Sequence, residues 1–203
     1  IARLIKGTSK VGKELDSLTD VISFGVAPAF IMYFWTLNSL GKVGWLISLI
    51  YVVCIALRLA RFNINTGTEP NWRVNFFEGI PSPAGGILVL SPLIYDVSGL
   101  NFLPFEIQMI TPILFVIISI LLISKIPTYS LKKIVVPRST TVFLLFGIIL
   151  VFGLLLIFPF KIIFIGCLGY LLAIPISIYH FNKIKKQNLN DQSMDDQEPE
   201  DIL

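Results

Sequence analysis

Three residues near the start of the chain have the types and the spacing to bind a metal ion beside a substrate. Gly12, Asp16 and Asp20 follow one another at intervals of four residues. On an α-helix this spacing puts two carboxylates one turn apart on one face, next to a patch without side chains. A hard divalent cation such as Mg²⁺ or Mn²⁺ accepts such oxygen ligands and completes its coordination with water or substrate phosphate.

A purely structural interpretation of the two acids is weaker. Negative charge is favourable at the start of a helix, but a cap needs one acid in the first turn. Asp20 instead lies two turns beyond Gly12 and directly precedes the apolar residues Val21 and Ile22. Acids entering a membrane span are costly, and function is the default hypothesis for them.

The elements that must position these acids are membrane helices. Of the residues, 55% are hydrophobic and 14% charged, and the mean hydropathy is +0.81. This composition predicts an all-α, polytopic transmembrane helix bundle. Six apolar stretches approach the ~20 residues that cross a bilayer. They are residues 18–37, 43–60, 83–100, 107–124, 140–158 and 162–181.

The distribution of positive charge predicts the orientation. With six alternating crossings, 14 of the 16 Lys and Arg residues fall on the side of residues 1–17, and only Lys42 and Lys161 fall on the other. The positive-inside rule then puts both chain ends, and the acidic pair, on the cytoplasmic side. Residues 182–203 turn polar, first basic and then acidic, and are predicted to form a disordered cytoplasmic tail. A nucleic-acid partner is not expected.

The acidic motif resembles part of a family signature. Ala2-Arg3, eight residues, Gly12, three residues, Asp16, three residues and Asp20 are similar to the second half of the signature of the CDP-alcohol phosphatidyltransferases. The first half of that signature, Asp-x-x-Asp-Gly, would stand just before Ile1. The resemblance therefore implies two further metal-binding acids upstream, about eight spans in the intact protein, and a fragment that is inactive by itself.

Three longer segments resemble the phosphatidylserine synthase branch of that family: residues 14–29, 56–63 and 79–85. Ser17 and Val21 stand where phosphatidylglycerophosphate synthases usually have Pro and Lys. We expect residues 1–138 to form the family core, residues 139–181 to add two transmembrane helices, and residues 182–203 to form the tail.

The resemblance implies a reaction and roles for single residues. The phosphatidyl group of CDP-diacylglycerol would be transferred to L-serine, with release of CMP, in a bacterial cytoplasmic membrane. Asp16 and Asp20 would bind Mg²⁺ or Mn²⁺, and Asp20 would also take the proton of the serine hydroxyl. Gly12 would let the nucleotide approach the helix backbone, and Arg3 would contact substrate or an acid of the pocket. Membrane lipid would surround the protein, and the family resemblance implies a homodimer.

An amino-acid acceptor also requires a partner for its carboxylate. Arg58 and Arg61 are three residues apart, so they share a helix face at the cytoplasmic end of the second span, with Asn63 nearby. A guanidinium can donate two parallel hydrogen bonds to a carboxylate. Two alternatives remain open, because either arginine could bind the lipid diphosphate or act as an interfacial anchor.

Two other functions remain as alternatives. The same reaction with another alcohol acceptor, glycerol phosphate or inositol phosphate, needs only a different acceptor pocket. A small ion-coupled membrane transporter would also place acids in a span. Against the transporter, the spans are almost purely apolar beyond the acidic end, apart from Asp96 near the opposite side.

Overall fold

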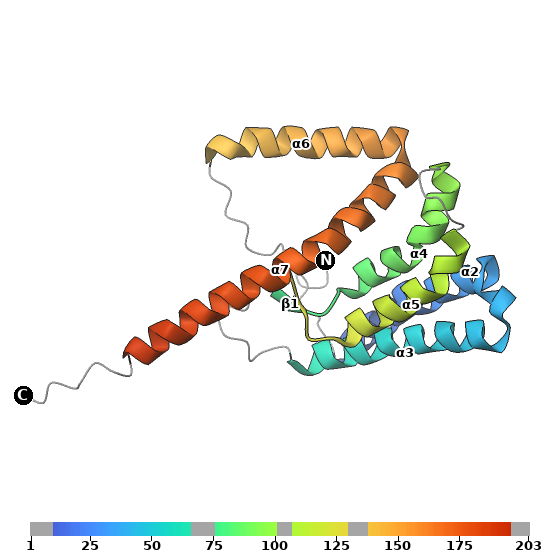
Figure 1. The fold of residues 1–203 in the computed structure, drawn as a ribbon, viewed down its shortest axis with the longest axis horizontal. Helices are drawn as coiled ribbons and strands as arrows, with labels where there is room; N and C mark the ends of the chain where they lie inside the picture. Colours follow the sequence, from blue (N-terminus) through green and yellow to red (C-terminus); the bar gives the residue numbers. More distant parts are fainter. Residues whose placement is uncertain (1–9, 66–75, 101–106, 130–137, 196–203) are drawn as a thin grey trace, which may run out of the picture.

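The computed structural model describes residues 10–65, 76–100, 107–129 and 138–195. Over these ranges the chain is helical apart from a short two-stranded ribbon (Figure 1). The elements in chain order are α1 (Lys10–Asp20), the π-helical segment η1 (Val21–Val26), α2 (Ala27–Trp35), the 3₁₀ segment η2 (Leu37–Leu40), α3 (Lys42–Asn65), β1 (Phe76–Glu78), α4 (Ser82–Ser98), α5 (Ile107–Ile123), β2 (Pro127–Tyr129), α6 (Arg138–Ile157) and α7 (Pro159–Asp195).

The predicted all-α membrane bundle is confirmed, since each of the six predicted apolar stretches contains a helix. Within the described ranges, four helical stretches are long and apolar enough to cross a membrane: Glu14–Trp35, Lys42–Ile64, Thr140–Ile157 and Pro159–Phe181. Helices α4 and α5 have 17 residues each and are shorter than expected. At 1.5 Å per residue such a helix is about 25 Å long, less than the ~30 Å hydrocarbon core.

Helices α1 and α2 form one continuous rod with a wider turn, η1, between them. Pro28 has no N–H and its ring would crowd the carbonyl of Phe24, four residues earlier. The turn widens before Pro28, and the Ala27 N–H bonds to Ile22 O, five residues back. The Tyr51 hydroxyl of α3 donates a 2.8 Å hydrogen bond to Phe24 O, which therefore has a partner inside the bundle.

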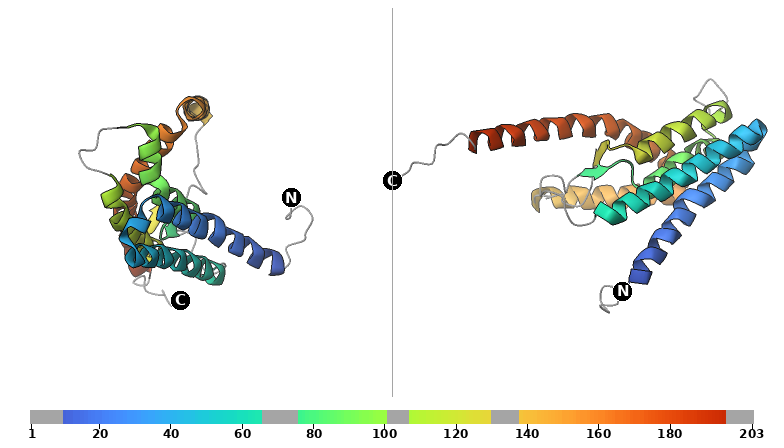
Figure 2. Two further views of the ribbon diagram at one scale, coloured as in Figure 1. Left: turned by 90° about the vertical axis from the view of Figure 1, so that its right-hand side faces the viewer. Right: turned by 90° about the horizontal axis from the view of Figure 1, so that it is seen from below.

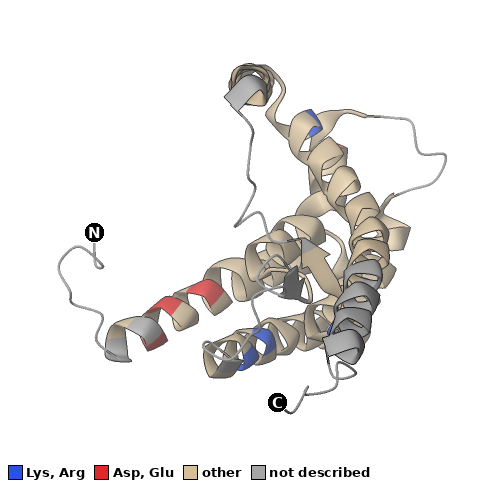
Figure 3. Cartoon of the chain, turned by 90° about the vertical axis from the view of Figure 1, so that its left-hand side faces the viewer, with Lys and Arg blue, Asp and Glu red and all other residues tan. Residues whose placement is uncertain are grey.

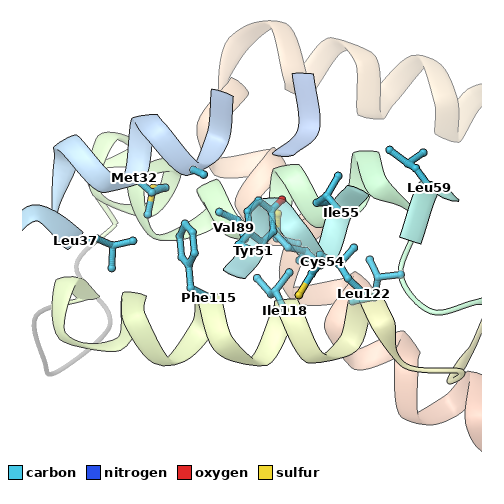
Figure 4. Close-up of a cluster of buried hydrophobic side chains, with 14 of the residues drawn as sticks. Met32, Leu37, Tyr51, Cys54, Ile55, Leu59, Val89, Phe115, Ile118 and Leu122 are labelled. Atoms are coloured by element: carbon cyan, nitrogen blue, oxygen red, sulfur yellow. The ribbon is translucent and has the colours of Figure 1, made fainter. Parts of the chain in front are cut away.

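The buried core lies between α2, α3, α4 and α5 (Figure 4). Tyr51 of α3 and Phe115 of α5 are fully buried and meet edge to face, with ring centroids 5.4 Å apart. Polar side chains in this interior bond to the backbone of their own helix, as Ser48 does to Gly44 O and Ser119 to Phe115 O. The interior therefore combines apolar packing with internally satisfied hydroxyls.

Two glycines bring the η1 segment close to its neighbours. A Cβ on Gly25 would lie 3.2 Å from the Ile55 side chain of α3, and one on Gly86 of α4 would lie 3.2 Å from Phe24 O. We call these two contacts the glycine layer. Small residues at helix contacts let backbones approach closely inside a membrane, so this layer fixes η1 against α3 and α4.

A two-stranded antiparallel ribbon, which the sequence did not predict, joins the ends of the helices. Strand β1 pairs with β2 with Phe77 opposite Thr128. Gly79, at φ +72°, follows β1; its N–H bonds to Ile126 O, and the Thr128 hydroxyl donates to Gly79 O at 2.7 Å. Pro81 then caps the start of α4. The ribbon therefore fixes where α4 begins and where α5 ends.

Helices α6 and α7 differ in how they pack. Helix α7 crosses α4 and β2, whereas α6 lies apart from α1–α5 (Figures 1 and 2). None of the residues in Thr140–Ile157 is buried, although they have the highest hydropathy of the four spans. Helix α7 continues to Asp195, so the helix extends into the tail for which we expected disorder. Residues 182–195 contain no Pro or Gly, which permits this continuation.

Candidate functional site

The predicted acidic and basic residues lie at the same end of the bundle. Asn63, in the last turn of α3, donates a 2.8 Å hydrogen bond from Nδ2 to Oγ of Ser17 in α1. Figure 3 shows acidic residues along α1 and basic residues on the neighbouring helix at this end. Helices α1 and α3, more than twenty residues apart in sequence, therefore carry opposite charges at the same end of the bundle.

The glycine layer is a reference point for how far along the bundle the site residues lie. Asp20 lies four residues before Phe24, and Ser82 lies four residues before Gly86. Arg58 lies three residues after Ile55, in a helix that runs the opposite way. Each is thus roughly one turn, about 5 Å along its helix, closer to the same end of the bundle. At this end Arg58 Nη1 donates a 2.9 Å hydrogen bond to Ser82 Oγ.

The acidic helix is the more open side of the site. Helices α1 and α3 diverge toward the first residues of α1 (Figure 2). Gly12 and Asp16 are exposed, and Asp20 is half-buried. Asp20 is therefore the carboxylate held closest to the bundle, while Asp16 and Gly12 remain open to a large substrate.

The donor chemistry of α1 fits part of a divalent-metal site. Asp16 and Asp20 supply carboxylate oxygens one turn apart, the ligand type that Mg²⁺ and Mn²⁺ prefer. Among the residues that the structure describes, no group of three or more His, Cys, Asp or Glu side chains could hold a metal ion. The pair therefore fits a site that substrate phosphate, water or acids outside the described ranges would complete.

The two arginines, equivalent in the sequence, have different environments. Arg61 donates from Nη1 to the carbonyl of Ile123, the last residue of α5, at 2.7 Å. An arginine at this position satisfies a helix-end carbonyl. Arg58 bonds to Ser82, and its buried Nε has no hydrogen-bond partner among the described residues. Arg58 is thus the arginine with a buried donor available to a ligand.

Sequence reasoning singled out the segment that contains Ser82 but missed the hydroxyls of Thr128 and Tyr170. Ser82, at the start of α4, and Thr128, in β2, are 1% and 2% exposed. Tyr170 of α7 is close enough to interact with both Arg58 and Thr128. The sequence did contain a signal, since Tyr170 and Ser177 are polar residues seven apart on one face of an otherwise apolar stretch. Arg3, also predicted for the site, lies outside the described residues.

Comparison with known proteins identifies the family. Residues 1–121 match the family model for CDP-alcohol phosphatidyltransferases. The chain belongs to this family. As a CDP-alcohol phosphatidyltransferase it carries the acidic helix, both arginines and Ser82 inside the matched region, whereas Tyr170 lies beyond it.

Individual members of the CDP-alcohol phosphatidyltransferase family give longer matches. The chain is 35% identical over 187 residues to a Mycobacterium leprae protein named CDP-diacylglycerol–serine O-phosphatidyltransferase, covering 89% of this chain and 60% of that protein. A Helicobacter pylori protein of the same name is 40% identical over 134 residues, covering 66% of this chain and 55% of that protein. The chain thus spans about 60% of the length of the mycobacterial relative. A match over 89% of the chain also necessarily continues into α6 and α7.

Proposed function

We propose that the full-length protein transfers the phosphatidyl group of CDP-diacylglycerol to L-serine and releases CMP. The observation that carries the proposal is that Asp20, a proton acceptor, and the buried Nε of Arg58, a donor for an oxyanion, lie at the same end of the bundle. The names of the mycobacterial and Helicobacter relatives support the same donor and acceptor.

The chemistry assigns one task to each group. The serine hydroxyl oxygen forms a bond to the phosphorus that carries the diacylglycerol, the bond from that phosphorus to the CMP oxygen breaks, and CMP departs with the electron pair. Asp20 takes the proton of the serine hydroxyl. A divalent cation, Mg²⁺ or Mn²⁺, bound by Asp16 and Asp20 would offset the charge on the diphosphate and the leaving group.

The remaining residues bind and orient the two substrates. The exposed Gly12 allows the cytidine nucleotide to lie against α1. Arg58 and Arg61 supply positive charge on the opposite side, and Asn63 holds α1 to α3 through Ser17. Arg3, just before this helix, is assigned to substrate binding. Together these residues align the serine hydroxyl with the phosphorus, and alignment is a major source of rate enhancement.

The surroundings of the site follow from the same proposal. We place the protein in a bacterial cytoplasmic membrane with the Asp20 end toward the cytoplasm, where the nucleotide-linked lipid and serine meet. The lipid chains remain in the bilayer while the head group enters from the side. Residues 1–138 form the reaction core, residues 139–181 form the added helices, and the protein acts as a homodimer.

A comparison of acceptors tests the proposed function. Full-length protein in mixed micelles with CDP-diacylglycerol and Mg²⁺ or Mn²⁺ should release CMP when L-serine is added, measured by coupled assay or chromatography. Glycerol phosphate and inositol phosphate should give little release. Equal or greater release with either phosphate would overturn the serine assignment. Metal-dependent ion flux in proteoliposomes without CMP release would instead favour the transporter.

A further inference from the structure

Three buried side-chain polar atoms have no hydrogen-bond partner among the residues that the structure describes: Arg58 Nε, Tyr170 OH and Ser177 Oγ. Two of them belong to Arg58 and Tyr170, whose side chains are close enough to interact electrostatically. Leaving buried donors unpaired is costly, and more so in a membrane protein. Two such donors from different helices at one place indicate a ligand.

The neighbouring hydroxyls do not use these donors. Ser82 Oγ accepts from Nη1 of Arg58, not from Nε. The Thr128 hydroxyl proton is donated to Gly79 O, and the Tyr170 hydroxyl has no bond of good geometry to it. The pocket defined by Arg58, Ser82, Thr128 and Tyr170 therefore retains one N–H and one O–H for a molecule from outside. Its four residues come from α3, α4, β2 and α7.

Two donors beside a positive charge select an anion. The Nε–H belongs to the side edge of the guanidinium, which can hold a carboxylate or phosphate by two parallel hydrogen bonds. A tyrosine O–H can donate a further bond to the same oxyanion. In the proposed reaction this anion is either the carboxylate of the acceptor or the diphosphate of the lipid.

The surroundings favour the acceptor. Ser82 and Thr128 are almost completely buried, and the four residues come from four different elements, so the site suits a small water-soluble molecule better than a head group with two acyl chains. The diphosphate has another binding partner on the open side, where the carboxylates of Asp16 and Asp20 would hold a divalent cation. Arg58 and Asp20 lie on the same side of the glycine layer, as required if one serine offers its hydroxyl to the acid and its carboxylate to the arginine.

We propose that Tyr170 of α7 completes, with Arg58, the pocket for the acceptor carboxylate and is a specificity-determining residue of the enzyme. This inference rests on the proposed function. It assigns a role to the last helix, which lies beyond the region matched by the family model.

The test replaces Tyr170 by Phe, with Tyr179→Phe as matched control on the same helix, where Tyr179 is 75% exposed. We expect Tyr170→Phe to raise the KM for L-serine about 10- to 100-fold, as for a lost hydrogen bond to a charged group. The KM for CDP-diacylglycerol should stay within about twofold. Tyr179→Phe should leave both constants unchanged.

A second acceptor separates recognition from a structural effect. Ethanolamine has the hydroxyl and amine of serine but no carboxylate. Tyr170→Phe should reduce the preference for L-serine over ethanolamine in kcat/KM, whereas a general loss of packing would lower both values equally. An increase in the KM for CDP-diacylglycerol with an unchanged KM for serine would assign the pocket to the diphosphate and overturn the proposal.

A binding measurement without turnover separates the proposed function from the proposed role of Tyr170. Calorimetric titration of the full-length protein with L-serine should show weaker binding to the Tyr170→Phe variant. If the wild type binds serine through Tyr170 but releases no CMP, the proposed function fails and the pocket stands. If the wild type is active and the variant binds and reacts with serine normally, only the pocket fails.

Discussion

Asn63 of α3 is hydrogen-bonded to Ser17 of α1 across 46 positions of sequence, at a distance of 2.8 Å. Ser17 lies between Asp16 and Asp20, directly after Asp16. The bond therefore determines how the acidic helix stands relative to the helix that carries Arg58 and Arg61.

Replacing Ser17 by Ala should lower kcat about fivefold, because one neutral hydrogen bond contributes about 1 kcal/mol to holding α1 in place. Steady-state CMP release measures this change. Ser39→Ala is the control, since the Ser39 hydroxyl bonds to Thr36 O in the η2 region, far from the acids in sequence. Equal loss in both variants would argue against a role of α1 placement in turnover.

Replacing Asp20 by Asn should lower kcat about 10²- to 10⁴-fold, the range for removal of a general base. The amide keeps the size of the side chain but cannot accept the proton. The exposed Asp96→Asn, near the end of α4, is the matched control and should keep wild-type turnover. Normal turnover in Asp20→Asn would remove Asp20 as the base.

Asp16→Asn should act on metal dependence. Loss of one carboxylate ligand weakens binding of a hard cation, so the Mg²⁺ or Mn²⁺ concentration for half-maximal CMP release should rise about tenfold or more. Chelation by EDTA should stop the wild type, and added metal should restore it. An unchanged metal titration in the variant would exclude Asp16 as a ligand.

The two arginines should differ in a paired substitution by lysine. Arg58→Lys removes the buried Nε–H, so the KM for serine should rise about 10- to 100-fold. Arg61→Lys keeps an ammonium that can donate to Ile123 O, so the rise should be clearly smaller. A larger effect at Arg61 would reverse their assignment.

Gly86→Ala tests the glycine layer. The added Cβ would lie 3.2 Å from Phe24 O and 3.3 Å from Phe24 Cα, and backbone atoms cannot easily move away. We expect destabilisation by about 1–3 kcal/mol, seen as earlier thermal unfolding in detergent. Gly147→Ala in α6 is the control, because its Cβ would meet nothing within 4 Å. Equal unfolding temperatures would show that η1 and α4 can separate without cost.

Hydropathy was sufficient to predict six helical segments, because runs such as residues 43–60 and 162–181 must form internally bonded backbone in a membrane. It did not reveal the wide turn at η1, which depends on Pro28 acting on Phe24. The same limit applies to the ribbon, whose strands of three residues each are too short for a periodic pattern.

The candidate site was predicted from sequence where one helix carries all its parts. Asp16 and Asp20 share a face by spacing alone. The neighbours of Arg58 come from three distant segments, so no local pattern links it to Ser82 or Tyr170. The unequal roles of Arg58 and Arg61 also depend on which helix each reaches, and this is a property of packing.

The wide turn of η1 also sets the direction in which Asp16 and Asp20 point around the helix axis. A π-helical turn holds one residue more than an α-helical turn. Deleting a single residue between Val21 and Val26 would rotate everything before it by about 100° around the rod. Asp16 and Asp20 would then turn away from Arg58 without any change in their own sequence, so the length of this six-residue segment matters to the site as much as its composition.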